Sequence, residues 1–406
     1  MAVGSNTFPN KMHAVSGFEL GTASAGIKTP GRKDVVLMRI CDAATVAGVF
    51  TKNAFCAAPV QICKQHLESA TSRYFIVNTG NANAGTGREG WNDAVATCTA
   101  VADLCGVDSD SVLPFSTGVI GEKLPVEKLI SALPAAKNAL SVDGWMEAAE
   151  GILTTDTRIK GASVQFSYQG KMVTLTGISK GSGMIKPNMA TMLGYVATDV
   201  AIDQSLLQQL LIDATNQSFN RITVDSDTST NDSCMLVATA QSDVRVSEGD
   251  QELLSLFSDA LVSIMQELAH AIVRDGEGAT KFVTVKVESA LTQEEALKTA
   301  FDIAHSPLVK TALFASDPNW GRILAVVGRA EITDLDLDAL EIYLGDVCIV
   351  SNGGRDAAYT EDAGQAVMDA EEILIRVVLN RGAISETVWT TDLSHDYVSI
   401  NADYRS

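Results

Sequence analysis

The most distinctive chemical feature of this sequence is a threonine behind a small residue in a Gly/Pro-rich loop. Thr191 follows Ala190 within the run KGSGMIKPNMATMLG at 180–194. A threonine hydroxyl is a weak nucleophile, and making the residue N-terminal activates it, because its own α-amine can then accept the proton. The reference pKa of an α-amine is about 7.7–8.0, so part of it is unprotonated near neutral pH. The loop therefore suits a chain that cuts itself between Ala190 and Thr191 and so gains a nucleophile and a base on one residue.

The alternative to self-cleavage is an ordinary Gly-rich turn that leads into a strand at 194–202. In that case Thr191 is a hydroxyl at the edge of the strand and has no chemical role. The loop alone leaves both interpretations open.

Four other residues carry side chains or backbone suited to acyl transfer. Thr117 and Gly118 follow an apolar run, where a glycine lets its N–H approach an oxyanion closely and a hydroxyl supplies a second donor. Lys180, in an otherwise acidic protein, is placed to bind an α-carboxylate as a point charge. Glu277 lies between two glycines and could contact substrate or carry a proton. Each residue also has an interpretation without a chemical role. Thr117 and Gly118 could form a plain turn, Lys180 could be a solvated lysine, and Glu277 could be a solvated acid in a loop.

The loop at 180–194 closely resembles the cleavage segment of the ornithine acetyltransferase family, also called the ArgJ family. Further similar segments lie along the whole chain, at 77–84, 116–121, 154–157, 275–281 and 401–404. The resemblance implies an α+β fold, a layered N-terminal-nucleophile-like sandwich at 1–284 that contains the cleavage site, and a smaller C-terminal α+β domain at 285–406 whose tail returns to the active site.

The same resemblance implies a bifunctional glutamate N-acetyltransferase of arginine biosynthesis. Such an enzyme moves an acetyl group from N-acetylornithine to glutamate through an acetyl-threonine, and some relatives also take the group from acetyl-CoA. It uses no cofactor beyond that co-substrate. Two α and two β chains from one precursor form the expected tetramer.

The resemblance also assigns roles to individual residues. Thr117 and Gly118 hold the oxyanion, and Thr191 is the nucleophile. The residues implied in substrate binding are Thr154, Lys180, Thr191, Glu277, Asn401 and Ser406. Many relatives end in threonine, so the terminal serine is a departure that keeps a hydroxyl.

Composition is compatible with such an enzyme. The chain has 406 residues, of which 46% are hydrophobic, and a formal net charge of -20. This acidity argues against nucleic acid or an anionic membrane as the main partner. Residues 1–9 lack the pattern of a signal peptide, and no apolar run looks long enough to span a bilayer, so we expect a cytoplasmic protein.

Strand-like and helical patterns alternate along the chain. A helix is predicted behind an Asp203 cap, a longer one over 253–272, and a third after a capping box of Thr292 and Glu295. The predicted strands lie at 34–40, 45–50, 74–78, 163–168, 173–178, 235–240, 282–287, 323–327, 340–344, 347–350 and 374–379. The Pro, Asn and Gly of the loop at 317–322 indicate a rigid structural corner.

Two competing classes of protein remain open. An N-terminal-nucleophile aminopeptidase or amidase of similar fold would share the cleavage site and pass its acyl group to water. A non-enzymatic protein would never cut the loop and would stay in one piece.

Overall fold

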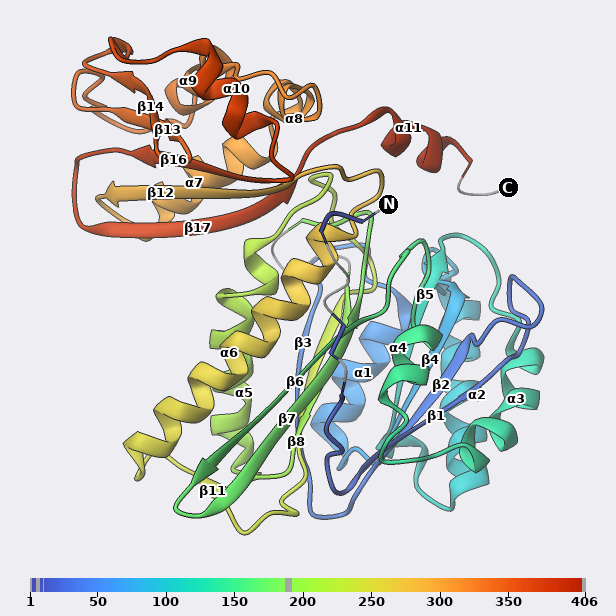
Figure 1. Cartoon of the computed structure of the whole chain (residues 1–406). Helices are drawn as coiled ribbons and strands as arrows, with labels where there is room; N and C mark the ends of the chain where they lie inside the picture. Colours follow the sequence, from blue (N-terminus) through green and yellow to red (C-terminus); the bar gives the residue numbers. More distant parts are fainter. Residues whose placement is uncertain (1, 5–7, 10, 187–191, 404–406) are drawn as a thin grey trace. The chain divides into compact units, whose positions relative to one another are not determined.

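A computed structural model describes residues 2–4, 8–9, 11–186 and 192–403 (Figure 1). The predictions that concern Ala190, Thr191 and Ser406 lie outside these residues. The chain divides into two compact units. The larger unit comprises 7–220 and 227–272, and the smaller unit comprises 1–6, 221–226 and 273–406.

The first sheet of the larger unit has four strands in the order β1-β2-β4-β5. They are β1 (Phe18–Ala23), β2 (Val35–Ile40), β4 (Tyr74–Asn81) and β5 (Val112–Val119). Side chains alternate between the two faces of a strand. In β2, Val36 and Met38 therefore enter one core cluster, while Val35 and Leu37 enter another on the opposite face.

The second sheet has five strands in the order β3-β10-β8-β7-β6. They are β3 (Thr45–Phe50), β6 (Lys160–Tyr168), β7 (Lys171–Lys180), β8 (Leu193–Thr198) and β10 (Ser233–Ala238). Its inner face shares one core cluster with the first sheet, because Tyr195 and Met235 pack with Phe75 and Phe115. A pair of short strands, β9 (Ala201–Ile202) and β11 (Arg245–Val246), lies apart from both sheets.

Helices cover the outer faces of both sheets. The helices α2 (Gly87–Cys105) and α3 (Val126–Asn138) pack on the first sheet, and α5 (Gln204–Asn216) and α6 (Gln251–Arg274) pack on the second (Figure 1). Two further helices, α1 (Ala58–Ser69) and α4 (Trp145–Gly151), contribute to the core between the sheets. The order helix, sheet, sheet, helix confirms the prediction of a layered α+β sandwich.

The smaller unit is also α+β and has a six-stranded sheet in the order β15-β14-β13-β16-β12-β17. Its strands are β12 (Phe282–Ala290), β13 (Glu341–Leu344), β14 (Val347–Ser351), β15 (Gly354–Arg355), β16 (Glu372–Val378) and β17 (Ile384–Thr391). Its helices are α7 (Gln293–Ala304), α8 (Pro307–Phe314), α9 (Trp320–Gly328), α10 (Glu361–Met368) and α11 (His395–Ala402). The predicted boundary after residue 284 falls within β12, and the assignment of functional domains stays a prediction.

One expectation about a single segment is wrong. The apolar run at 323–327 forms helix α9 rather than a strand, because Asn319 caps it by accepting a hydrogen bond from the Arg322 amide, and its buried residues Ile323, Val326 and Val327 recur at helical spacing. Helix α6 is long and apolar enough, by length and composition, to cross a membrane. Its apolar face, including Phe257 and Leu261, is buried in the protein, which is typical of a core helix.

Candidate functional site

Thr117 and Gly118 lie at the end of β5, where it runs parallel to β4. Thr117 is buried and pairs in register with Thr79, while Gly118 pairs with Gly80. Gly118 has a φ of 138°, and a Cβ built on it would lie 2.3 Å from the carbonyl carbon of Gly80. Only glycine fits this backbone contact. The predicted oxyanion pair therefore occupies a rigid, close-packed strand end.

A network of asparagine side chains fixes this strand end. The Asn231 Nδ2 donates to the carbonyl oxygens of Ala82 (2.6 Å) and Ser116 (2.9 Å). The Ser116 hydroxyl donates to Asn78 Oδ1 at 2.6 Å, and Asn78 Nδ2 donates to the carbonyl of Asn81 at 2.8 Å. These bonds are buried, so the network orders the backbone immediately before Thr117.

Lys180 and Thr154 meet at the end of β7. The Lys180 Nζ donates to the Thr154 hydroxyl at 3.1 Å, and Lys180 is only 4% exposed. Asp156, for which the sequence predicts no role, organises the surrounding groups. Its Oδ1 accepts hydrogen bonds from Lys160 Nζ (2.6 Å) and from the Gly181 amide (2.7 Å), and its Oδ2 accepts one from the Thr154 amide (3.0 Å).

These contacts determine the charge of Asp156. Burial by itself raises the pKa of this carboxyl, but the ammonium groups of Lys160 and Lys180 and the hydrogen bonds to the carboxylate outweigh it. The pKa of Asp156 is therefore held well below its ordinary value. The group stays ionised and balances the two buried lysines.

A second buried carboxyl group, Asp232, lies directly before β10. Its Oδ1 accepts a hydrogen bond from the Met192 amide at 3.0 Å, and the residue is 1% exposed. Burial raises the pKa of Asp232 well above its ordinary value, although the Met192 amide and the charge of Lys180 act in the opposite direction. Lys180 therefore lies in the field of two carboxyl groups whose pKa values are shifted in opposite directions, a pattern typical of enzyme sites.

In the smaller unit, Glu277 and Asn401 lie together. The Asn401 Nδ2 donates to Glu277 Oε2 at 2.8 Å, and Glu277 is 8% exposed. Asn401 belongs to α11, so this helix is docked on the Glu277 loop. Gly278 makes this docking close, because a Cβ built on it would lie 2.5 Å from the Tyr397 amide nitrogen.

Asp392 supports the loop that carries Glu277. Its Oδ1 accepts hydrogen bonds from the amides of Thr280 (2.8 Å) and Lys281 (2.9 Å), and its Oδ2 accepts one from the Thr280 hydroxyl (2.6 Å). The Ser394 hydroxyl donates to the carbonyl of Gly278 at 2.6 Å and also caps α11. The segment before α11 thus anchors both the loop and the helix.

Sequence reasoning missed Asn231, Asp156 and Asp232, each of which has at least one partner that is distant in the chain. The one available signal was the dense polar run at 225–233 directly before a buried strand.

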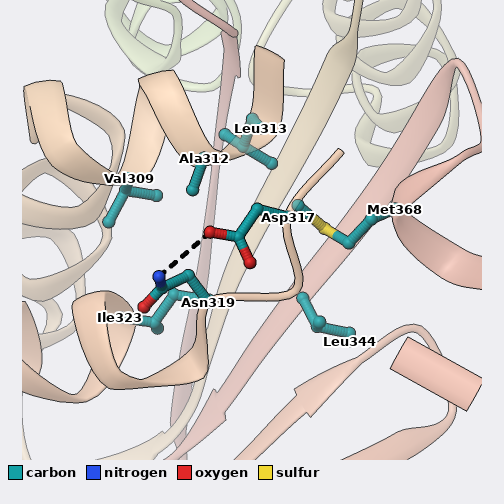
Figure 2. A pocket seen from close by; sticks show the side chains of 8 residues that line it. All are labelled: Val309, Ala312, Leu313, Asp317, Asn319, Ile323, Leu344 and Met368. Atoms are coloured by element: carbon teal, nitrogen blue, oxygen red, sulfur yellow. Dashed lines mark hydrogen bonds between the residues drawn. The ribbon is translucent and has the colours of Figure 1, made fainter. Parts of the chain in front are cut away.

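Two cavities lie away from the predicted residues. One of about 440 Å³, in the larger unit, is lined by Ala54, Phe55, Cys56, Ala58, Gln61, Gly85, Thr86, Gly87 and Trp91. The other, in the smaller unit, holds only about 10 Å³ and has apolar walls (Figure 2). At its edge Asn319 Nδ2 donates to Asp317 at 3.0 Å, and the space is too small for more than one water. These features support a structural role for the loop at 317–322.

Buried ionisable groups with pKa values shifted in opposite directions are typical of enzyme sites, and here they lie at strand ends in a layered α+β sandwich. Similarity to known proteins identifies the family. The profile of the ArgJ family matches residues 19–406. The chain belongs to the ArgJ family.

Two curated relatives match this chain over its full length, and one solved structure matches about half of it. The arginine biosynthesis bifunctional protein ArgJ of Pseudomonas syringae pv. tomato is 60% identical over 407 residues, with 100% of both chains covered. The protein of the same name from Pseudomonas fluorescens is 58% identical over 407 residues, again with 100% of both covered. A crystal structure of the arginine biosynthesis bifunctional protein from Bacillus halodurans is 36% identical, with a TM-score of 0.48, and the match covers 51% of this chain and 97% of that chain.

Proposed function

We propose that this protein is a self-processing acetyltransferase of arginine biosynthesis that moves an acetyl group from N-acetylornithine to glutamate. The observation that carries the proposal is membership of the ArgJ family over 19–406, together with full-length relatives named arginine biosynthesis bifunctional protein. The relatives are named bifunctional, which indicates two activities. The second activity that we propose is transfer of an acetyl group from acetyl-CoA to glutamate.

The proposed processing step begins with attack of the Thr191 hydroxyl on the carbonyl carbon of Ala190. The C–N bond breaks as an ester forms, and water then hydrolyses the ester. This releases the carboxylate of Ala190 and leaves Thr191 with a free α-amine.

The proposed transfer then uses that amine as general base. The Thr191 hydroxyl attacks the acetyl carbonyl of N-acetylornithine, and its proton passes through the α-amine to the departing ornithine nitrogen. The amine of glutamate attacks the resulting acetyl ester and restores the hydroxyl. Donors at Thr117 and Gly118 are proposed to hold the oxyanion, a role that the rigid strand end of β5 supports.

Substrate binding is proposed for the remaining residues of the family pattern. Lys180 and Thr154, joined by a hydrogen bond, offer an ammonium group and a hydroxyl to the α-carboxylate that both amino acids carry. Glu277 and Asn401, which also contact each other, offer a carboxylate and an amide. Ser406 is proposed as a further substrate-binding residue because of the family resemblance. The same resemblance is the basis for proposing a cytoplasmic location and a tetramer of two α and two β chains.

The variant Thr191→Ala tests the proposal. It removes the hydroxyl, so we expect an uncut chain of 406 residues that forms no N-acetylglutamate, measured by intact mass and by incubation with N-acetylornithine and glutamate. The matched control is Thr198→Ala in β8, where a buried hydroxyl makes no hydrogen bond within the described part of the chain. An active Thr191→Ala protein would show that another group is the nucleophile. A wild-type protein that cuts peptide amides and makes no N-acetylglutamate would favour the aminopeptidase class.

A further inference from the structure

The loop at 24–33, between β1 and β2, gathers positive charge in an otherwise acidic protein. It carries Lys28, Arg32 and Lys33, whereas the chain as a whole has a formal net charge of -20. The proposed function gives this loop no role. A local excess of cations on an acidic protein favours an anionic ligand.

Hydrogen bonds fix the backbone of this loop. The buried carboxyl group of Asp34 accepts the amides of Ala25 at 2.6 Å and of Ile27 at 2.7 Å. On the surface, Lys128 Nζ donates to the carbonyl oxygen of Gly26 at 2.8 Å. The loop therefore presents its side chains from an ordered backbone.

The loop contacts both parts of the candidate site that belong to the larger unit. It packs on the end of β4, where a Cβ built on Gly80 would lie 3.1 Å from the Cβ of Lys28. Arg32 Nη2 donates to the carbonyl oxygens of Leu153 at 2.6 Å and of Thr154 at 3.3 Å. Arg32 therefore lies beside Thr154, one of the residues proposed to bind the α-carboxylate.

Most of the donors of Arg32 are available to a ligand. Within the described part of the chain only its Nη2 makes hydrogen bonds, and both acceptors are neutral carbonyl groups. The three N–H groups on Nε and Nη1 remain, and a guanidinium binds a carboxylate with two parallel hydrogen bonds. The next residue, Lys33, is instead paired with Glu150 at 2.9 Å.

The proposed reaction requires a cation of this kind. N-acetylornithine and glutamate share an α-carboxylate, but the side chain of ornithine ends in an amine and that of glutamate ends in a second carboxylate. Lys180 and Thr154 are proposed for the shared group. The second carboxylate of glutamate then still needs a cationic partner, because a desolvated charge without one is costly.

We propose that Arg32 forms a subsite for the γ-carboxylate of glutamate, an inference that rests on the proposed acetyl transfer. The carbonyl oxygen of Thr154 contacts Arg32, and its hydroxyl oxygen, four covalent bonds away, contacts Lys180. These contacts keep Arg32 Nη2 within roughly 11 Å of Lys180 Nζ. An extended glutamate has about 5 Å between its two carboxyl carbons and, with a hydrogen bond at each end, bridges a distance of this size.

The charges of the surrounding groups match a dicarboxylate. Lys160, Lys180 and Arg32 are cationic, Asp156 is ionised, and burial favours the neutral form of Asp232. Two positive charges are therefore left for the two carboxylates of glutamate.

A purely structural role is the competing explanation, in which Arg32 only fastens the loop to the carbonyl groups at 153–154. The two roles affect different halves of the reaction. A γ-carboxylate subsite matters when glutamate accepts the acetyl group and not when N-acetylornithine donates it, whereas a displaced loop would disturb both halves. The test variant is Arg32→Gln. The matched control is Lys33→Gln, which removes a charge from the same loop that Glu150 already pairs.

Steady-state kinetics with glutamate and single-turnover release of ornithine from N-acetylornithine measure the two halves separately. We expect Arg32→Gln to lower kcat/KM for glutamate by about 10- to 100-fold, the usual effect of losing a hydrogen bond to a charged group. Ornithine release should keep the wild-type rate. The preference for glutamate over glutamine should also fall, because glutamine has no γ-carboxylate. Lys33→Gln should match wild type in every measurement.

An Arg32→Gln protein with unchanged kcat/KM for glutamate overturns the assignment, as does one in which ornithine release slows by the same factor. If the variant does not fold, the wild-type enzyme supplies the test. Glutarate should compete with glutamate at least about 10-fold better than pentanoate, which has the same chain length and one carboxylate. Equal inhibition by the two acids overturns the assignment. The proposed function itself fails if wild type makes no N-acetylglutamate from N-acetylornithine and glutamate.

Discussion

At the scale of single residues, the same side-chain type takes opposite charge states in neighbouring environments. Asp156 is surrounded by two ammonium groups and by amide donors, which hold its pKa down. At Asp232 burial raises the pKa, although the Met192 amide, the charge of Lys180 and the side chains of Ser229 and Thr51 act in the opposite direction. The charges of the two neighbouring ammonium groups, with the hydrogen bonds to the carboxylate, therefore keep Asp156 ionised, whereas burial dominates at Asp232.

Removing the Asp156 charge should destabilise the protein strongly at neutral pH. In Asp156→Asn, Lys160 remains buried without its ionised partner, and breaking such a pair costs about 3–5 kcal/mol. The folded-state pKa of Asp156 lies below the unfolded value, so its contribution is present above about pH 3.9 and is lost as pH falls through the folded pKa.

Urea unfolding at pH 7 and near pH 3 measures this difference. The gap between wild type and Asp156→Asn should be largest at pH 7 and should narrow in acid. Asp143→Asn, at an exposed position, is the control and should change stability by less than about 0.5 kcal/mol. Equal midpoints for Asp156→Asn and wild type at pH 7 would contradict the ion-pair argument.

At the scale of elements, the contact between the ends of β4 and β5 requires a glycine at one position. Gly118 combines a positive φ with direct contact to the backbone of Gly80, whereas Gly121 has a φ of 83° but no atom within 4 Å of an added Cβ. Comparing the same substitution at the two positions therefore separates the cost of backbone strain from the cost of steric overlap.

Gly121→Ala should cost about 1–2 kcal/mol, the cost of a left-handed conformation for a residue with a Cβ. Gly118→Ala should cost about 3 kcal/mol or more, because overlap with the neighbouring strand adds to that strain. Unfolding midpoints of the two variants measure the difference. If the two variants are equally stable, the close strand contact does not constrain this position.

At the scale of the whole molecule, the proposed cut would divide the chain into pieces of 190 and 216 residues, since 406 minus 190 is 216. The second sheet of the larger unit would then be built from strands of both pieces. Strands β3, β6 and β7 would belong to the first piece, while β8 and β10 would belong to the second. Because β10 lies between β3 and β8, each piece supplies hydrogen bonds and core that the other needs.

We therefore expect the two pieces to elute together from gel filtration in native buffer and to separate only in denaturant. The Thr191→Ala chain should elute at the same volume as a single polypeptide. A free piece that keeps its secondary structure in native buffer would contradict the shared-sheet argument.

Local patterns predicted much of the fold. The alternation at 45–50 matches β3, and the Thr292 hydroxyl caps α7 by accepting the Glu295 amide at 3.1 Å. The strand predicted at 323–327 was wrong because a short apolar stretch fits a strand or a buried helix equally well. The cap formed by Asn319 favours the helix.

What the amino-acid order determined alone is the set of features that depend on near neighbours: periodicity, caps, turns and the reactive loop at 180–194. Only the tertiary structure decided which groups share an environment. Asp156 meets the Gly181 amide, 25 residues away, and Asp232 meets the Met192 amide, 40 residues away. Burial and distant charges set the protonation of such groups, and both arise only when separate strands come together in one sheet.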